Sequence, residues 1–308
     1  MNTDKIKRIF AIFLSSTVLF ACASPTKKTV YMDKDFPGLT PKIYAPDAFS
    51  LPDRFEHGLT FRKGGTEHYF MLAGGKVWKY KKIMRHTLSD NGQAKLEAIN
   101  FTDHIPRKNN GIIGGEPIFS LDEKTLYFVA DYPTDIWQVK LDNNGNWGTP
   151  TKLGPEINSR YSEWFPTIAP DNHLYFSRTI KKIAKIYKAE LIDDEYKKVT
   201  PLDAKFNYDC GDQVFSKKMD YIIFTSPRKG GHGELDLYVA FKKTNNEWTD
   251  GINLGPEINT KGFEFGPFIS PDNRFLFFTR RDRFNKATSS DVYWVSLDII
   301  EQLREQAL

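Results

Sequence analysis

Three glutamates occupy matching places in a repeated pattern, and carboxylates gathered at one place can bind a cation or a polyhydroxylated ligand. Glu56, Glu163 and Glu264 each lie five residues before the last apolar residue of a predicted strand. Like charges brought together repel, so water, a cation or basic groups such as His57 or Arg160 have to offset them. We therefore take Glu56, His57, Glu163 and Glu264 as the candidate ligand site, at one mouth of a channel.

A structural role for the same glutamates is the alternative. Arg178 and Arg280 follow the next predicted strand in two of the repeats, so ion pairs between strands can recur from repeat to repeat. Such structural networks perturb carboxylates as much as ligand sites do. The two interpretations differ in geometry: the carboxyl groups either share one channel mouth or lie in separate places.

The remaining residue types show no catalytic or cofactor pattern. Six histidines are scattered along the chain, and none forms an H-E-x-x-H pair, so metal binding is left undetermined. The glycine-rich stretch at 229–233 lacks the spacing of a phosphate-binding loop. The sequence therefore predicts no cofactor and indicates no catalytic residue.

A repeat of about fifty residues positions the candidate site. Leu-Gly-Pro-Glu-Ile-Asn occurs at 153–158 and again at 254–259, and the flanking residues also match. Pro-Asp-Asn follows at 170–172 and at 271–273, where it suits a tight turn between two strands. Weaker copies bring the number of repeats to five, and each contributes one phenylalanine at the end of its second strand: Phe70, Phe128, Phe176, Phe224 and Phe278.

These repeats predict an all-β fold, a β-propeller of four-stranded antiparallel blades. Stacking the sheets around an axis covers their apolar faces and leaves only short edges. Five blades are expected, with six as the alternative if residues 81–110 hold a degenerate blade. The fifth repeat lacks a fourth strand, so we expect the N-terminal segment 42–49 to supply it. Asp298 and Glu301 predict a short C-terminal helix through a capping box.

The Pro-Asp-Asn turns, followed by Leu-Tyr-Phe or Leu-Phe-Phe and later by Asp-Val-Tyr or Asp-Leu-Tyr, resemble the WD40-like repeat of the Pro-Asp type. That repeat builds the propeller of the Tol-Pal periplasmic protein, and the resemblance covers nearly all of 40–297. It is specific in the third and fifth repeats and loose in the first and fourth. The chain lacks the separate N-terminal α/β domain of the Tol-Pal protein, so membership of that system is not implied.

The N-terminal residues resemble an export signal. Basic residues precede an apolar stretch over 9–20, which is short for a membrane-spanning helix. Ala21-Cys22 resembles the bacterial lipobox, which implies lipidation of Cys22 and cleavage before it; Phe20 departs from that pattern. Ordinary signal-peptidase cleavage, giving a soluble periplasmic protein, is the alternative. Ala23 favours the outer membrane by the same resemblance, facing the periplasm or the cell surface.

The predicted organisation is therefore a signal peptide over 1–21, a lipid-anchored polar tether over 22–39 and a single propeller domain over 40–308, closed by an N-terminal strand. The formal net charge is +4, with no one-sided basic block, so we expect no nucleic-acid partner. Membrane contact is expected through the lipid anchor only. The sequence leaves the oligomeric state undetermined.

The function expected from these features is a non-enzymatic module of the cell envelope. It would bind a protein, a peptidoglycan-linked partner or a glycan. A polysaccharide hydrolase or lyase is the alternative, because propellers also host paired carboxylates. That alternative needs two carboxyl groups with unequal roles flanking a sugar, and the sequence shows only equivalent acids in a ring.

The lipidation prediction can be tested by substituting the modified residue. Cys22→Ser should release the protein to the soluble periplasm or block its processing, because the serine hydroxyl cannot replace the thiol that takes up the lipid. Membrane fractionation and the mobility of the mature chain measure both effects. Normal processing together with retention in the membrane fraction would show that Cys22 is not the anchor.

Overall fold

The computed structural model describes most of the chain after its first 29 residues. The described residues are 30–52, 54–74, 80–89, 94–99, 101, 112–131, 133–281 and 289–307. The predicted signal peptide, Cys22 and the start of the predicted tether lie outside them. No helix in this described part of the chain is long and apolar enough to cross a membrane.

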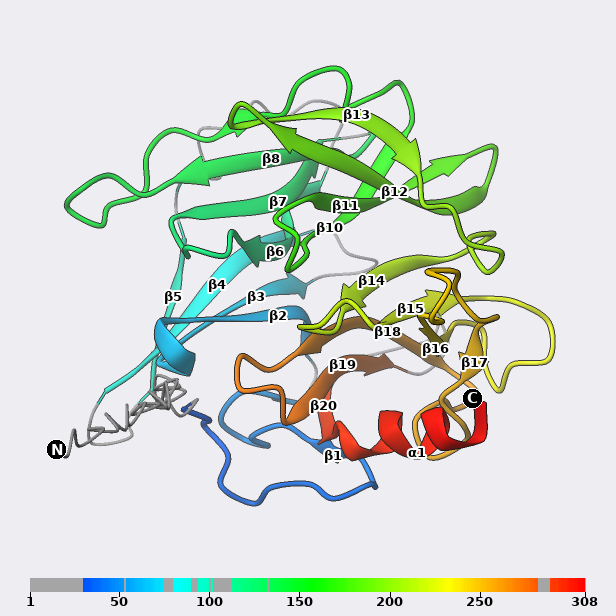
Figure 1. Cartoon of the computed structure of the whole chain (residues 1–308). Helices are drawn as coiled ribbons and strands as arrows, with labels where there is room; N and C mark the ends of the chain where they lie inside the picture. The colour runs from blue at the N-terminus through cyan, green and yellow to red at the C-terminus, as the bar shows by residue number, and fades with distance from the viewer. Residues whose placement is uncertain are drawn as a thin grey trace, which may run out of the picture.

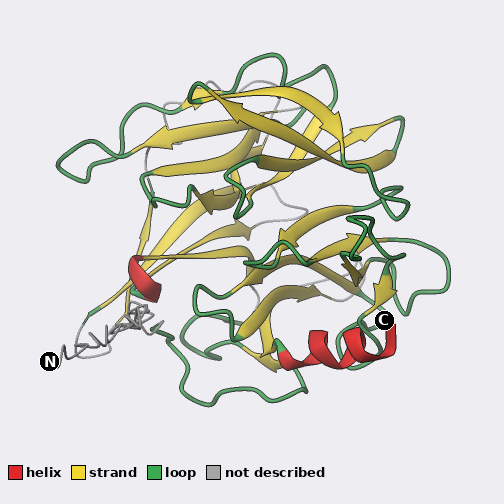
Figure 2. Cartoon of the chain, in the orientation of Figure 1, coloured by secondary structure: helices red, strands yellow, loops and turns green. Residues whose placement is uncertain are grey.

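Twenty strands of the described residues form five four-stranded antiparallel sheets, which we number as blades 1 to 5 (Figures 1 and 2). Blade 1 consists of β2 (Phe55–Arg62), β3 (Glu67–Gly74), β4 (Tyr80–Leu88) and β5 (Ala94–Ala98). Blade 2 consists of β6 (Ile112–Phe119), β7 (Thr125–Asp131), β8 (Asp135–Lys140) and β9 (Thr151–Lys152). Blade 3 consists of β10 (Ser162–Ile168), β11 (Leu174–Ile180), β12 (Ile183–Ile192) and β13 (Glu195–Pro201).

Blades 4 and 5 complete the ring. Blade 4 consists of β14 (Gly211–Phe215), β15 (Tyr221–Ser226), β16 (Asp236–Phe241) and β17 (Ile252–Asn253). Blade 5 consists of β18 (Phe263–Ile269), β19 (Phe275–Arg281), β20 (Asp291–Ser296) and, as its outer strand, β1 (Lys42–Ile43). The inner strands β2, β6, β10, β14 and β18 gather at the centre of the molecule (Figure 1).

The predicted fold class is confirmed. Five blades form, because β4 and β5 occupy the part of 81–110 that a sixth blade would have needed, and they complete blade 1 instead. Helix α1 (Asp298–Ala307) follows the last strand, as the capping box predicted. The five repeated phenylalanines are at most 1% exposed, since neighbouring blades cover both faces of each sheet. Burying each side chain contributes about 2 kcal/mol.

The segment around β1 joins blade 5 to blade 1. Lys42 pairs with Trp294 and Ile43 with Tyr293 in antiparallel register. The chain then places Tyr44 and Phe49, both fully buried, between the two blades. The ring of Tyr44 lies 5.1 Å from that of Trp294 in blade 5, and the ring of Phe49 lies 4.5 Å from that of Phe70 in blade 1. The N-terminal segment therefore holds the two ends of the ring together.

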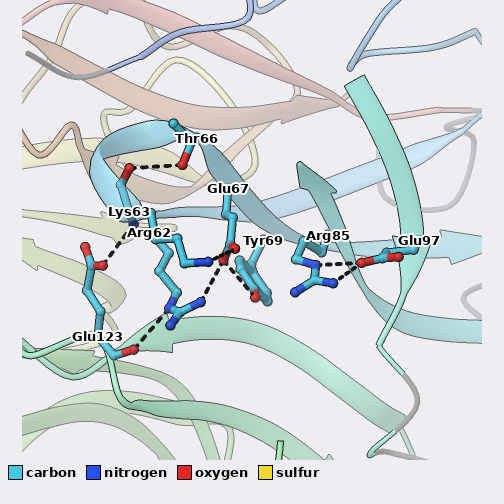
Figure 3. A network of polar contacts seen from close by, with 8 residues as sticks. All are labelled: Arg62, Lys63, Thr66, Glu67, Tyr69, Arg85, Glu97 and Glu123. Atoms are coloured by element: carbon cyan, nitrogen blue, oxygen red, sulfur yellow. Dashed lines mark hydrogen bonds and ion pairs between the residues drawn. The ribbon is translucent and has the colours of Figure 1, made fainter. Parts of the chain in front are cut away.

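A polar network links blades 1 and 2 at the far end of their inner strands (Figure 3). Arg62 donates through Nη1 to Glu67 Oε2 at 2.8 Å, and through Nε to the Glu123 carbonyl of blade 2 at 3.1 Å. Lys63 donates its backbone N–H to Glu123 Oε2 at 2.9 Å. Tyr69 donates to Glu67 as well, at 3.2 Å. These bonds join the two blades at this end of their inner strands.

Removing one aromatic ring from the closing segment tests its contribution to stability. Phe49→Ala should lower the free energy of unfolding by about 3–5 kcal/mol, because it leaves a cavity between blades 5 and 1. Leu121→Ala, at an exposed turn residue, is the control and should change it by no more than about 0.5 kcal/mol. Urea unfolding measures both changes. If Phe49→Ala lowered the free energy of unfolding no more than Leu121→Ala does, the N-terminal segment would not hold the ring closed.

Candidate active site at the centre of the propeller

Each inner strand carries a β-bulge at the same place. The pairing register of the inner strand with the second strand shifts there in all five blades, which leaves two residues unpaired. The first of these two residues has a positive φ in every blade: 66° at Gly58, 52° at Glu116, 47° at Phe165, 40° at Asp212 and 62° at Gly266. The five bulges are therefore equivalent positions around the propeller axis.

Glycine adopts such a conformation without strain, whereas a side chain makes it costly. Gly58 and Gly266 follow that rule in blades 1 and 5. Glu116, Phe165 and Asp212 break it in blades 2, 3 and 4, at a cost of about 1–3 kcal/mol each. Strained residues of this kind gather at functional sites, so the three side chains are the first candidates for function.

The bulges approach each other closely at the axis. A Cβ atom on Gly58 would lie 3.3 Å from the Cα of Glu116. A Cβ atom on Gly266 would lie 3.7 Å both from the backbone nitrogen of Gly58 and from Cε2 of Phe165. The ring of Phe165 thus reaches across the centre into the space that the two glycines leave open. Glu116 and Asp212 flank it from the neighbouring blades.

Hydrogen bonds between blades hold the two carboxyl groups in place. Phe165 donates its backbone N–H to Glu116 Oε2 at 2.5 Å, and Gly266 donates its own to Asp212 Oδ2 at 3.2 Å. Gln213 also donates through Nε2 to the Phe165 carbonyl at 2.9 Å. One oxygen of each carboxyl group is thus bound by a backbone N–H group of the next blade.

The two carboxyl groups differ in acidity. Burial, together with the negative charge of Asp212, raises the pKa of Glu116 to about 8, against the opposing attraction of Lys81. Burial also raises the pKa of Asp212, to about 6, and the hydrogen bond from Gly266 limits that rise. Because like charges close together disfavour double ionisation, one proton is retained by the pair near neutral pH. The higher pKa assigns it to Glu116.

A small cavity of about 20 Å³ lies beside the bulges. Residues of all five inner strands line it, and most are apolar, such as Leu59, Pro117 and Phe268. Of the two acids, Glu116 lines this cavity, and its apolar surroundings are consistent with the raised pKa of Glu116.

The three glutamates predicted from the sequence as site residues do not lie at the bulges. Glu56, Glu163 and Glu264 are fully buried, and each forms an ion pair with an arginine of its own blade. Glu163 Oε1 lies 2.8 Å from Arg178 Nε, and Glu264 Oε1 lies 3.1 Å from Arg280 Nε.

The backbone of these glutamates binds the preceding blade. Their N–H groups donate to the carbonyls of Ser290, Thr134 and Leu235, in the order Glu56, Glu163 and Glu264. The three carboxyl groups thus lie between different pairs of blades, as in the structural alternative. Burial raises the pKa of each despite the arginine partners. Of the four predicted site residues, His57 lies closest to the bulges: it precedes Gly58, and its ring centre is 5.5 Å from that of Phe265.

Glu116 and Asp212 were missed because neither stands out as a residue type. One signal was available: Glu116, Phe165 and Gly266 each precede a proline at the same place in the repeat. Aligning the repeats on that proline would have shown one acid among the bulge residues. Asp212 precedes Gln213 instead of a proline, so only the three-dimensional structure shows that it occupies the same bulge position. The described residues contain no group of three His, Cys, Asp or Glu side chains placed to bind a metal ion.

No family model and no curated protein matches the sequence. Similar folds among solved structures include a family 117 glycoside hydrolase of the marine bacterium Zobellia galactanivorans. It is 15% identical, with a TM-score of 0.51, over 85% of this chain and 92% of that one. An α-L-arabinofuranosidase from Lactobacillus brevis is 12% identical, with a TM-score of 0.49, over 79% and 92%. An exo-β-1,3-galactanase from Phanerochaete chrysosporium is 14% identical, with a TM-score of 0.48, over 86% and 65%.

The prediction of a non-enzymatic binding module is wrong. It depended on the apparent lack of two unequal carboxyl groups, and the structure places such a pair, Glu116 and Asp212, at the centre of the propeller. Solved structures with a similar fold include glycoside hydrolases, a periplasmic gluconolactonase and peptidases, and this likeness shows the fold alone. The carboxyl pair removes the reason for which the alternative, an enzyme that acts on polysaccharide, was ranked second.

The different roles of the two sets of acids can be separated by stability measurements. Glu163→Ala should destabilise the fold by about 3 kcal/mol, because it removes one partner of a buried ion pair. Glu116→Gln should leave stability unchanged or raise it. The pKa of Glu116 is higher in the folded than in the unfolded protein, so its ionisation as pH rises weakens the fold, and an amide avoids this. The reverse order of stabilities would contradict this assignment.

Proposed function

We propose that this protein is a glycoside hydrolase that acts on a polysaccharide, with its reaction at Glu116 and Asp212. The observation that carries the proposal is the unequal carboxyl pair on two strained bulges, each held by one backbone N–H group of the next blade. Hydrolysis of a glycosidic bond needs two carboxyl groups, one protonated and one ionised. The environments of Glu116 and Asp212 supply that difference near neutral pH.

Glu116 is the general acid in this proposal. It transfers its proton to the glycosidic oxygen as the bond from that oxygen to the anomeric carbon breaks, and the leaving sugar departs as an alcohol. Asp212 supports the positive charge that develops on the anomeric carbon. In one route it removes a proton from the water that attacks this carbon. In the other it attacks the carbon itself, and a water then releases the sugar from Asp212 while the Glu116 carboxylate takes the proton of that water. The anomeric form of the first product distinguishes these two routes.

The backbone hydrogen bonds position the two groups for this reaction. The N–H of Phe165 holds Glu116 Oε2, and the N–H of Gly266 holds Asp212 Oδ2. Since both donors belong to bulges, the carboxyl groups cannot rotate without breaking contacts between blades. This preorganisation lowers the cost of reaching the transition state.

We also propose that the enzyme works outside the cytoplasm, anchored by lipid on Cys22 to the outer membrane. The support is the signal-like sequence over 1–21 and the resemblance of the repeats to the Pro-Asp propeller repeat of exported proteins. An enzyme anchored in this way meets polysaccharides that a cytoplasmic enzyme does not meet.

Substitution of the pair tests the catalytic roles. Glu116→Gln and Asp212→Asn should each lower kcat roughly 100- to 10,000-fold, because proton transfer or charge stabilisation is lost while the shape is kept. Reducing-end release from a panel of polysaccharides measures the effect. Glu257→Gln, at an exposed loop residue, is the matched control and should retain full activity. Full activity of either site variant would reject the assignment.

The dependence of kcat/KM on pH should be bell-shaped. Activity rises as pH increases through about 6, where Asp212 loses its proton, and falls as pH increases through about 8, where Glu116 loses its own. Asp212→Asn should remove the rising limb from its residual activity. A profile that stays flat from pH 5 to 9 would contradict the proposed roles.

A further inference from the structure

Two histidines lie buried under the closing segment of the ring, residues 42–49. His68 of β3 and His86 of β4 are direct partners in the pairing of these strands, so their side chains share one face of blade 1. His68 is fully buried, and His86 is 3% exposed. The ring centre of Phe49 lies 6.4 Å from that of His68 and 5.6 Å from that of His86. Both imidazoles therefore lie between the closing segment and blade 1.

The hydrogen bonds of the two rings suit their neutral forms. His68 Nε2 lies 2.8 Å from the Tyr44 hydroxyl oxygen, which accepts the backbone N–H of Met32 at 2.9 Å. The described residues offer the Tyr44 hydroxyl no other acceptor, so it donates to Nε2. Neither Nδ1 of His68 nor either ring nitrogen of His86 has a hydrogen-bond partner in the described part of the chain. A proton added to His68 Nε2 would displace the one that Tyr44 donates, and a proton added to His86 would have no acceptor there.

Arg54 faces these rings from the loop that follows the closing segment. It donates through Nη2 to the Phe49 carbonyl at 2.7 Å and forms an ion pair with Glu56. Its charge disfavours a second positive charge on His86. Burial raises the pKa of Glu56 to about 7, so Glu56 becomes neutral on acidification and does not offset a charge on His86. Lys82, on the same face of β4, is exposed to water.

The carboxyl groups of the other surrounding elements bind elsewhere. Asp33 accepts a backbone N–H of the closing segment through Oδ2 at 3.1 Å. Glu67 directly precedes His68, so its side chain lies on the opposite face of β3, where it pairs with an arginine of its own blade. Blade 5 presents uncharged rings, such as that of Trp294, 5.1 Å from the ring of Tyr44. The surroundings therefore supply no counter-charge for a protonated imidazole.

Protonation of the two histidines and closure of the ring oppose each other. Burial, together with His86, lowers the pKa of His68 to about 3. Burial, together with the charge of Arg54, lowers the pKa of His86 to about 4. A histidine exposed to water has a pKa of about 6.5. The closed ring therefore binds these protons less readily than an open one. Its stability is fully present above pH 6.5 and falls as pH decreases towards 4.

We propose that closure of the propeller is acid-sensitive, and that protonation of His68 and His86 releases the closing segment from blade 1. When Phe49 and Tyr44 move away, both imidazoles reach water and each takes up a proton. The strands of blade 1 keep their own pairing in this step. The inference goes beyond the proposed function and is independent of it, because it concerns the contact between blades 5 and 1 and not the carboxyl pair.

The expected size follows from the change in pKa on opening. Between pH 7.5 and pH 5, the equilibrium constant for opening should rise about 30-fold for each histidine. Glu56 opposes this rise by about 60-fold, because its pKa is raised in the closed ring and acid stabilises that form. The two histidines together exceed this opposition, and a net rise of about tenfold remains.

Hydrogen exchange of the closing segment measures its opening. The backbone N–H of Tyr44 donates to the Val292 carbonyl and that of Phe49 to the Ala45 carbonyl, both at 2.8 Å, so both exchange when the segment opens. In the wild-type protein, protection of residues 42–49 should fall about tenfold from pH 7.5 to pH 5, after correction for the intrinsic exchange rate. Unchanged or increased protection at pH 5 would overturn the proposal.

Matched variants assign the effect to the buried rings. His86→Phe keeps an aromatic ring beside Phe49 and Phe70 but cannot be protonated. The ratio of protection at pH 7.5 to that at pH 5 should therefore be about 30-fold smaller than in the wild type. His86→Leu, a smaller apolar side chain, should give the same result. His232→Gln, at an exposed loop residue, is the control and should match the wild type.

Circular dichroism establishes that each variant is folded. Equal ratios in the wild type and in both His86 variants would overturn the proposal, as would a ratio that falls as much in His232→Gln. Exchange is measured without substrate, so its outcome does not depend on the roles of Glu116 and Asp212. Loss of the pH-dependent protection in His86→Phe together with full activity of Glu116→Gln would count against the proposed function alone.

Discussion

The convergence of five inner strands on one axis is the constraint on which the site depends. Regular strands would carry their side chains into the same narrow space, and each blade avoids this with a bulge of positive φ. Two blades meet the constraint with glycine, at Gly58 and Gly266, and the room so gained is taken by the ring of Phe165. Glu116 and Asp212 accept backbone strain instead, which fixes their carboxyl groups at the centre.

Two sets of acids illustrate how position decides the role of a carboxylate in a propeller. Glu163 lies between blades, where Arg178 Nε is 2.8 Å away and the group serves the packing of the blades. Glu116 lies at the axis, where its bound donor is a neutral backbone N–H group and a second acid raises its pKa. Burial raises the pKa of both carboxyl groups, but only Glu116 is placed to give a proton to a bound ligand.

Much of the fold could be predicted from the sequence, because repeated turns and core phenylalanines such as Phe176 and Phe278 recur at a nearly constant spacing. The functional site could not be predicted in the same way. Repetition draws attention to residues that recur, such as Glu163 and Glu264, and those residues join neighbouring blades. Glu116 and Asp212 differ from their counterparts in the other blades, and that difference becomes visible only when the bulges are superimposed.

The central claim is that Glu116 and Asp212 form one electrostatically coupled pair, and the titration of Glu116 tests it most directly. Infrared difference spectra between the wild type and Glu116→Gln isolate the carboxyl band of Glu116 as a function of pH. We expect a band that titrates near pH 8 and moves to lower pH in Asp212→Asn, because the neutral amide no longer opposes ionisation of Glu116. Titration between pH 4 and 5, unchanged by Asp212→Asn, would contradict it.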